Sequence, residues 1–161
     1  MLLGDLLNHG PRNRVPQSYS PMDVAPQLDR FKDRIIAVRG NCDSEVDQMV
    51  FSFPCTASYG WILLQRSDKT LRVMLTHGHL YRYETEAERD KLGLKAGDVV
   101  LSGHTHVSGI FKKPSGVINV NPGSTTIPKG GTPAGFAVMD EDGITLCNLN
   151  GDTVNFFNFN S

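Results

Sequence analysis

The amino-acid sequence predicts an α/β fold, built on a mixed sheet or on a sandwich of two sheets. Early in the chain, helical patterns alternate with strand-like apolar runs, which is typical of strands joined by helices. Late in the chain, strand-like runs follow one another with only turns between them, which is typical of antiparallel hairpins. The length of 161 residues fits one domain with a full hydrophobic core.

The first part of the chain predicts two short strands and two helices. Residues 2–6 resemble the end of a buried strand. Residues 20–32 predict a helix, because a serine cap is followed by a proline at the first helical position, and Pro26 predicts a kink. Residues 35–38 predict a second buried strand, and residues 45–51 predict a short helix.

The middle and last parts predict a hairpin, a further helix and a series of strands. A hairpin turning at Ser67-Asp68-Lys69 joins residues 61–64 to residues 71–75. Residues 85–93 predict a helix whose first turn carries acidic residues, as the helix dipole favours. The other predicted strands are residues 98–101, 109–112, 117–120, 134–139, 144–149 and 153–159.

Composition excludes several classes of partner. The formal net charge is −1 and no basic block occurs. The sequence therefore has no strong nucleic-acid footprint and no basic patch of the kind that binds an anionic membrane surface. No apolar run is long enough to span a membrane. The three cysteines are an odd number without metal-like spacing, which predicts reduced thiols and a cytoplasmic protein.

Polar side chains beside a glycine follow four of the apolar runs. Because sites in α/β sheets form where the carboxyl ends of several strands meet, we expect these side chains to lie together. Carboxylate, amide and imidazole donors suit Mn, Fe, Zn or Ni better than Ca or Mg. The four segments are Gly4-Asp5, Gly40-Asn41-Cys42-Asp43, His77-Gly78-His79 and Gly103-His104-Thr105-His106.

The order of these motifs resembles the calcineurin-like metallophosphoesterases. Gly-Asn-Cys-Asp at residues 40–43, Asp-Leu-Leu-Asn-His-Gly-Pro-Arg-Asn at 5–13 and Asn-Pro-Gly-Ser at 121–124 resemble the small bacterial branch, the YfcE-type phosphodiesterases. The resemblance implies a four-layer α/β sandwich of mixed β-sheets. It also implies hydrolysis of a small phosphodiester by a hydroxide that bridges two divalent ions, with Mn expected and Fe, Zn or Ni as alternatives.

The same resemblance assigns metal ligands. Asp5 would bridge the two ions, Asn41, His77 and His104 would complete the second metal site, and His106 would bind the first. These five residues therefore form the expected metal set.

Further residues are expected near the substrate. Of the two histidines at residues 77–79, His77 is favoured as the metal ligand because it directly follows the strand. His79 is expected to contact the substrate or to support a ligand. His9 and Arg12 lie where a substrate phosphate could be met, although a solvated loop explains them equally well. Cys42 stands where most relatives have the histidine that protonates the leaving group. A thiol is a poor substitute, so Asp43 could instead orient a ligand or the substrate.

The largest departure is at the start. The family opens with a strand carrying Asp-x-His, which supplies two ligands of the first metal, and no such motif occurs here. We therefore expect residues 1–161 to be a single metallophosphoesterase domain, N-terminally truncated by one strand-helix unit, with a weak first metal site and impaired activity. The alternative is a genuine variant that acts as a non-catalytic protein-interaction scaffold, as a retromer subunit of this fold does. The aromatic residues of the last strand could also support a homo-oligomer.

Overall fold

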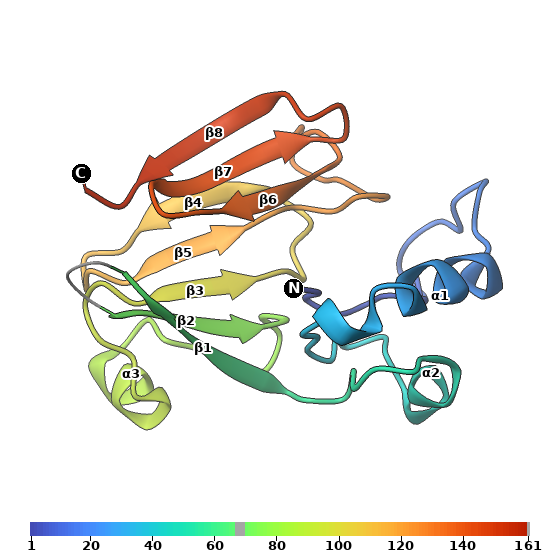
Figure 1. The fold of residues 1–161 in the computed structure, drawn as a ribbon, viewed down its shortest axis with the longest axis horizontal. Coiled ribbons are helices and arrows are strands. Elements are labelled where there is room, and N and C mark those ends of the chain that lie inside the picture. The colour runs from blue at the N-terminus through green and yellow to red at the C-terminus, as the bar shows by residue number, and fades with distance from the viewer. Residues whose placement is uncertain (67–69, 161) are drawn as a thin grey trace.

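The computed structural model describes residues 1–66 and 70–160, and it confirms the predicted α/β class (Figure 1). The larger sheet contains β1 (Tyr59–Gln65), β2 (Thr70–Thr76), β3 (Val99–Ser102), β4 (Gly109–Lys112) and β5 (Ile118–Asn121), in the order β1-β2-β3-β5-β4. β2, β3 and β5 run parallel, whereas β1 and β4 run antiparallel to their neighbours. The predicted turn at Ser67-Asp68-Lys69 lies outside the described residues.

A second sheet packs on one face of the first. It consists of β6 (Gly135–Met139), β7 (Gly143–Asn148) and β8 (Thr153–Asn158), paired antiparallel, which confirms the predicted closing meander. Its buried Ile144 and Leu146 share one apolar cluster with residues of the larger sheet, such as Val73, Leu101 and Val120. The core between the two sheets is thus formed by the alternating apolar residues of both.

Helix α3 (Glu86–Leu92) lies by the opposite face of the larger sheet, where Met74, Val100 and Leu94 form a separate cluster (Figure 1). The Thr85 hydroxyl caps the start of α3 by accepting a hydrogen bond from the Glu88 N–H. No helix in the part of the chain that the structure describes is long and apolar enough to cross a membrane.

The N-terminal third lies beside the sheets and contains α1 (Pro21–Asp29), the 3₁₀ helix η1 (Lys32–Arg34) and α2 (Glu45–Val50) (Figure 1). The strands predicted at residues 2–6 and 35–38 are wrong as full strands, because they meet in a single parallel bridge between Leu2 and Ala37. The helix predicted to reach residue 32 is also wrong in length. It ends at Asp29, whose carboxylate accepts hydrogen bonds from Ser52.

Strand register places the candidate site at one sheet edge. Thr76 of β2 lies opposite Ser102 of β3, so the chain leaves both strands at the same end. The N-terminal segment reaches this end, where Leu3 lies against Gly103. Three segments that are far apart in the sequence therefore converge there.

Candidate metal centre

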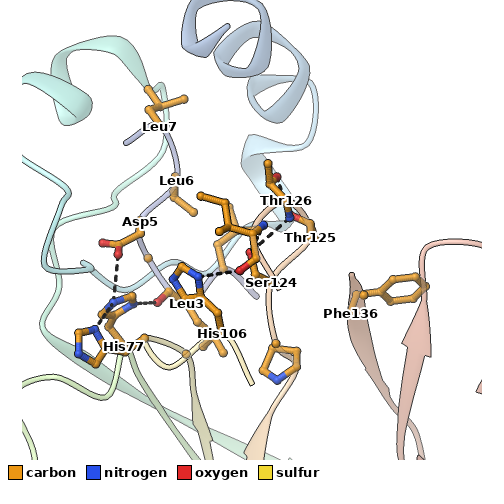
Figure 2. Close-up of a pocket in the computed structure, with 18 of the residues that line it drawn as sticks. Leu3, Asp5, Leu6, Leu7, His77, His106, Ser124, Thr125, Thr126 and Phe136 are labelled. Carbon is orange, nitrogen blue, oxygen red and sulfur yellow. Dashed lines mark hydrogen bonds and ion pairs between the residues drawn. The ribbon is translucent and has the colours of Figure 1, made fainter. Parts of the chain in front are cut away.

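Four of the predicted metal ligands contact one another. His77 Nε2 lies 3.3 Å from Asp5 Oδ2 and 3.1 Å from Asn41 Oδ1, and the two side chains Asp5 and His77 face each other in Figure 2. His104 Nδ1 lies 2.8 Å from Asn41 Oδ1 and 3.3 Å from His77 Nε2. The structure thus brings one carboxylate, one amide oxygen and two imidazoles into a single cluster.

Backbone carbonyls fix the orientation of two histidines. His77 Nδ1 is 2.6 Å from the Leu3 carbonyl, and His106 Nδ1 is 2.8 Å from the Ile127 carbonyl. A proton on Nδ1 donates in each case, which leaves the Nε2 lone pair available to a metal ion. His106 is therefore oriented so that its Nε2 could bind an ion, and it is held by the Ile127 carbonyl rather than by the other four residues.

The backbone is strained at three of the predicted ligands. Among the described residues, the non-glycine residues with positive φ are Asp5 (54°), His104 (67°) and His106 (61°). This conformation is uncommon for residues other than glycine, and such strain concentrates at functional sites. The coincidence of strain with the predicted ligands supports a functional role for the cluster.

Two glycines allow the N-terminal segment to approach the loop at residues 39–43. A Cβ on Gly4 would collide with the Gly40 backbone, and a Cβ on Gly40 would collide with the Asp5 carboxylate. Gly4 also has a φ of 91°. Both positions require glycine because the backbones lie too close for a side chain.

Asp43 is buried and holds the loops together. Its Oδ2 accepts hydrogen bonds from the Asp5 and Gly40 N–H groups, each at 2.7 Å, and its Oδ1 accepts one from the Leu6 N–H at 2.9 Å. Both carboxylate oxygens are therefore engaged by backbone, which suits an orienting role better than proton transfer.

The hydrogen bonds of the cluster determine its charge. Burial disfavours ionised Asp5, but hydrogen bonds from His77 and from the Cys42 N–H outweigh burial and lower the pKa of this carboxyl. Burial also disfavours protonated His77, but Asp5 and the Leu3 carbonyl outweigh it and raise the pKa of His77. In the absence of a metal ion, ionised Asp5 and protonated His77 thus favour each other, and a metal ion at Nε2 would take the place of that proton.

Other groups near the cluster stay neutral at pH 7. Burial, followed by the charge of His77, lowers the pKa of both His79 and His104. Burial and the neighbouring Asp5 raise the pKa of Cys42 to about 11. A neutral imidazole is the form that binds metal, whereas a neutral thiol is neither a metal ligand nor a strong acid.

The predicted substrate residues lie in different places. Arg12 lines a small cavity of about 50 Å³ together with Asn41, Cys42 and the ligand histidines His104 and His106. His9 does not line it; instead, its ring makes an edge contact with Tyr19. The ring of His79 lies 5.2 Å from that of His77, and its Nδ1 has no hydrogen-bond partner.

Two further residues belong to the site: Asn121, which the sequence offered only as part of the Asn-Pro-Gly-Ser motif, and Lys129, which sequence reasoning missed. The buried Asn121 donates hydrogen bonds from Nδ2 to the Gly103 carbonyl and to Thr105 Oγ1, and so fixes the loop that carries His104. Lys129 lines the small cavity. Lys129 lies between Pro128 and Gly130-Gly131, and proline and glycine mark turns. This sequence could have indicated a lysine held in a tight turn.

A larger cavity of about 670 Å³ opens beside His106. It separates the N-terminal segment from β6, an edge strand of the smaller sheet; Phe136 of β6 borders it, with a ring that points away from Leu3 in Figure 2. Core residues such as Leu101 and Val120 also line it. The cavity is therefore mainly apolar and continuous with the space between the two sheets.

The donor spacing fits one metal ion. Adjacent ligands of an octahedral ion, each about 2.1 Å from the metal, lie roughly 3 Å apart. The contacts among Asp5, Asn41, His77 and His104 span 2.8 to 3.3 Å. Within residues 1–66 and 70–160, no three His, Cys, Asp or Glu side chains are arranged as a metal site by themselves.

Residues 4–143 match the calcineurin-like phosphoesterase superfamily domain. The chain belongs to this superfamily. It is 43% identical over 154 residues to Escherichia coli phosphodiesterase YfcE, covering 96% of this chain and 78% of YfcE. The solved structure of E. coli YfcE, described as a phosphoesterase, matches with a TM-score of 0.84 and 39% identity, over 98% of this chain and 82% of that one. A predicted phosphoesterase from Streptococcus pneumoniae, 16% identical with a TM-score of 0.50, covers 98% of this chain and 95% of its own and shares the fold.

These comparisons confirm three predictions. The family is the one that the motifs indicated, the fold is that of the metallophosphoesterases, and the chain is a phosphoesterase-type hydrolase. Enzymes of this superfamily generally use divalent metal ions.

Proposed function

We propose that this protein is a metal-dependent phosphodiesterase. The observation that carries the proposal is the cluster of Asp5, Asn41, His77 and His104, whose side-chain oxygens and nitrogens contact one another at 2.8 to 3.3 Å and could converge on one divalent ion. When bound, such ions supply a water of lowered pKa as nucleophile and neutralise charge on the phosphoryl oxygens. The kinship with YfcE, itself named a phosphodiesterase, supports a small phosphodiester as substrate.

The chain's own residues hold and orient the reacting groups. Asp5 is placed to contribute to both metal positions, since it contacts His77 and lines the small cavity with His106. Asp43 keeps Asp5 in place through the backbone N–H groups described above. The mixture of oxygen and nitrogen donors supports Mn as the physiological metal, with Fe, Zn or Ni as alternatives.

Leaving-group protonation by Cys42 is weak under this proposal. With a pKa of about 11, the thiol stays protonated but is a poor hydrogen-bond donor and a poor acid at pH 7. Asp43 cannot replace it, because both of its oxygens accept backbone hydrogen bonds. The site therefore favours phosphodiesters with good leaving groups.

The first metal position has few ligands. Asp5 and His106 are its candidates, and the large apolar cavity lies next to them. β6 is an edge strand of its sheet on this side. The Leu2 N–H already donates to the Ile36 carbonyl, and the Leu2 carbonyl accepts from the Val38 N–H. A further strand seated between Leu3 and β6 would fill this cavity and end beside the metal position. We propose that residues 1–161, without such a strand-helix unit in this cavity, have impaired activity.

An exposed apolar patch on the smaller sheet supports binding of a partner protein. Phe136, Val138 and Phe156 are each 39–47% exposed, and their pairing through Cys147 and Thr145 places them on the outer face of the smaller sheet. Such a patch favours a homo-oligomer or the scaffold alternative. The intact ligand cluster favours the enzyme. The free thiols of all three cysteines support a cytoplasmic location.

The test is Mn-dependent hydrolysis of bis(p-nitrophenyl) phosphate by the wild-type chain and by Asn41→Ala. We expect Asn41→Ala to lose nearly all metal-dependent activity, because the amide oxygen contacts two ligand histidines. Asn150→Ala, in an exposed turn between β7 and β8, is the matched control and should keep wild-type activity. Equal rates for the two variants would overturn the assignment of this cluster.

A further inference from the structure

Two cations flank the small cavity above the ligand cluster. Arg12 and Lys129 both line it, and so do Asp5, Asn41 and His106. Arg12 comes from the loop after the N-terminal segment, whereas Lys129 comes from the loop between β5 and β6. The fold thus brings two basic residues from distant parts of the sequence to one cavity, and the charge of Arg12 already acts on His104 and Cys42.

Backbone contacts fix the position of Lys129. Its N–H donates to the His106 carbonyl at 2.9 Å, and its carbonyl accepts from Thr132 Oγ1 at 2.8 Å. Thr132 Oγ1 in turn accepts from the Ser108 N–H at 3.3 Å. The Lys129 loop is therefore bound directly to the loop that carries His106.

Arg12 is held by a comparable turn. The Asn13 N–H donates to the Gly10 carbonyl at 3.2 Å, and Asn13 Nδ2 donates to the His9 carbonyl at 2.6 Å. Gly10 has a φ of 72°, and a Cβ added there would lie 2.8 Å from Cys42 Sγ, so this turn packs against the loop of Asn41. Both cations thus project from loops that are tied to the ligand cluster.

We infer that Lys129 and Arg12 form a cationic clamp that holds the phosphoryl group of the substrate over the ligand cluster. A cavity of about 50 Å³ admits one such group and little more. Arg binds phosphoryl oxygens through two parallel N–H donors, and Lys acts as a point charge. Lys129 is a substrate-binding residue in this account, which rests on the proposed function because Asp5 would repel an anion until metal ions offset its charge.

The test is the affinity of inorganic phosphate for the Zn²⁺-loaded chain, measured by NMR titration of backbone amides, together with KM and kcat for the aryl phosphodiester with Mn²⁺. Lys129→Met removes the charge and keeps the length of the side chain. We expect it to weaken phosphate binding and raise KM roughly three- to tenfold, as for a partly exposed charge contact, with little change in kcat. Lys129→Arg should restore most of the affinity.

Lys91→Met is the matched control, since Lys91 is an exposed lysine of α3, by the opposite face of the larger sheet. Lys91→Met should bind phosphate as the wild type does. If Lys129→Met matches Lys91→Met, or if phosphate does not bind the loaded wild type at the Lys129 and Arg12 amides, the clamp is wrong. Absence of hydrolysis with phosphate binding intact would instead contradict the proposed function and leave the clamp standing.

Discussion

The two halves of the ligand cluster differ in how many donor groups they hold together, although both line the cavity of about 670 Å³. In the closed half, His77 and His104 leave adjacent parallel strands, Asn41 contacts both, and Asp5 contacts His77, so four donors meet. In the open half, His106 is held by one loop carbonyl and has Asp5 as its only further candidate partner among the described residues. Histidines that leave paired neighbouring strands are therefore brought into contact, whereas one held by a loop alone stands apart.

The largest expected effect is on Mn²⁺ affinity, which should depend on the closed half and not on the open half. His104→Ala should weaken the first Mn²⁺ to bind by about a hundredfold or more, since even residues that merely support ligands cost ten- to hundredfold. His106→Ala should change that affinity by less than about threefold, because the ion occupies the closed half. Calorimetric titration of each variant with Mn²⁺ provides the measurement. Equal losses would show that the halves are not distinct.

A large effect on stability is expected at the contact beneath the closed half. Gly40→Ala should destabilise the fold by about 2 kcal/mol, because the new Cβ collides with the Asp5 carboxylate. Gly60→Ala, where a Cβ meets nothing within 4 Å, is the matched control and should be nearly neutral. Urea unfolding of both variants measures the difference. A neutral Gly40→Ala would mean that the two loops are not in close contact.

A smaller effect is expected behind the closed half. Asn119 Nδ2 donates to Tyr83 Oη at 2.7 Å and to Ser102 Oγ at 3.0 Å, which supports the end of β3. Tyr83→Phe should cost about 1 kcal/mol at pH 7 through the lost hydrogen bond.

The same residue predicts a pH dependence. Burial raises the pKa of Tyr83, so its contribution is fully present below the unfolded value of about 10 and is lost as the pH rises through the folded value. Tyr83→Phe should therefore lose less stability above pH 10 than the wild type. Tyr59→Phe, at an exposed tyrosine, is the control and should follow the wild-type curve. Parallel curves for all three proteins would contradict this role of Tyr83.

The sequence could predict the parts of the fold that depend on local pattern. The alternation in β6, β7 and β8 located these strands to within about two residues, because each pairs with a neighbour across a short turn. Residues 2–6 and 35–38 carry equally apolar runs, yet they form one bridge, because extended pairing depends on partner strands that local pattern cannot supply.

The same distinction applies to the site. Asp5, Asn41, His77 and His104 could be found because each follows an apolar run in a short motif with glycine. The carbonyl of Ile127 and the side chain of Lys129 could not, since their positions depend on how one loop packs on another. The roles of His9 and His79 also depend on such packing, and they stay predictions.

The measurement that tests the account most directly is Mn²⁺ stoichiometry with aryl phosphodiester hydrolysis, on this chain and on a chimera preceded by a strand-helix unit that carries the family's Asp-x-His motif. We predict one tightly bound ion and slow turnover for this chain, and two ions with faster turnover for the chimera. A folded chimera that binds no additional ion and hydrolyses no diester would contradict the account and favour the scaffold.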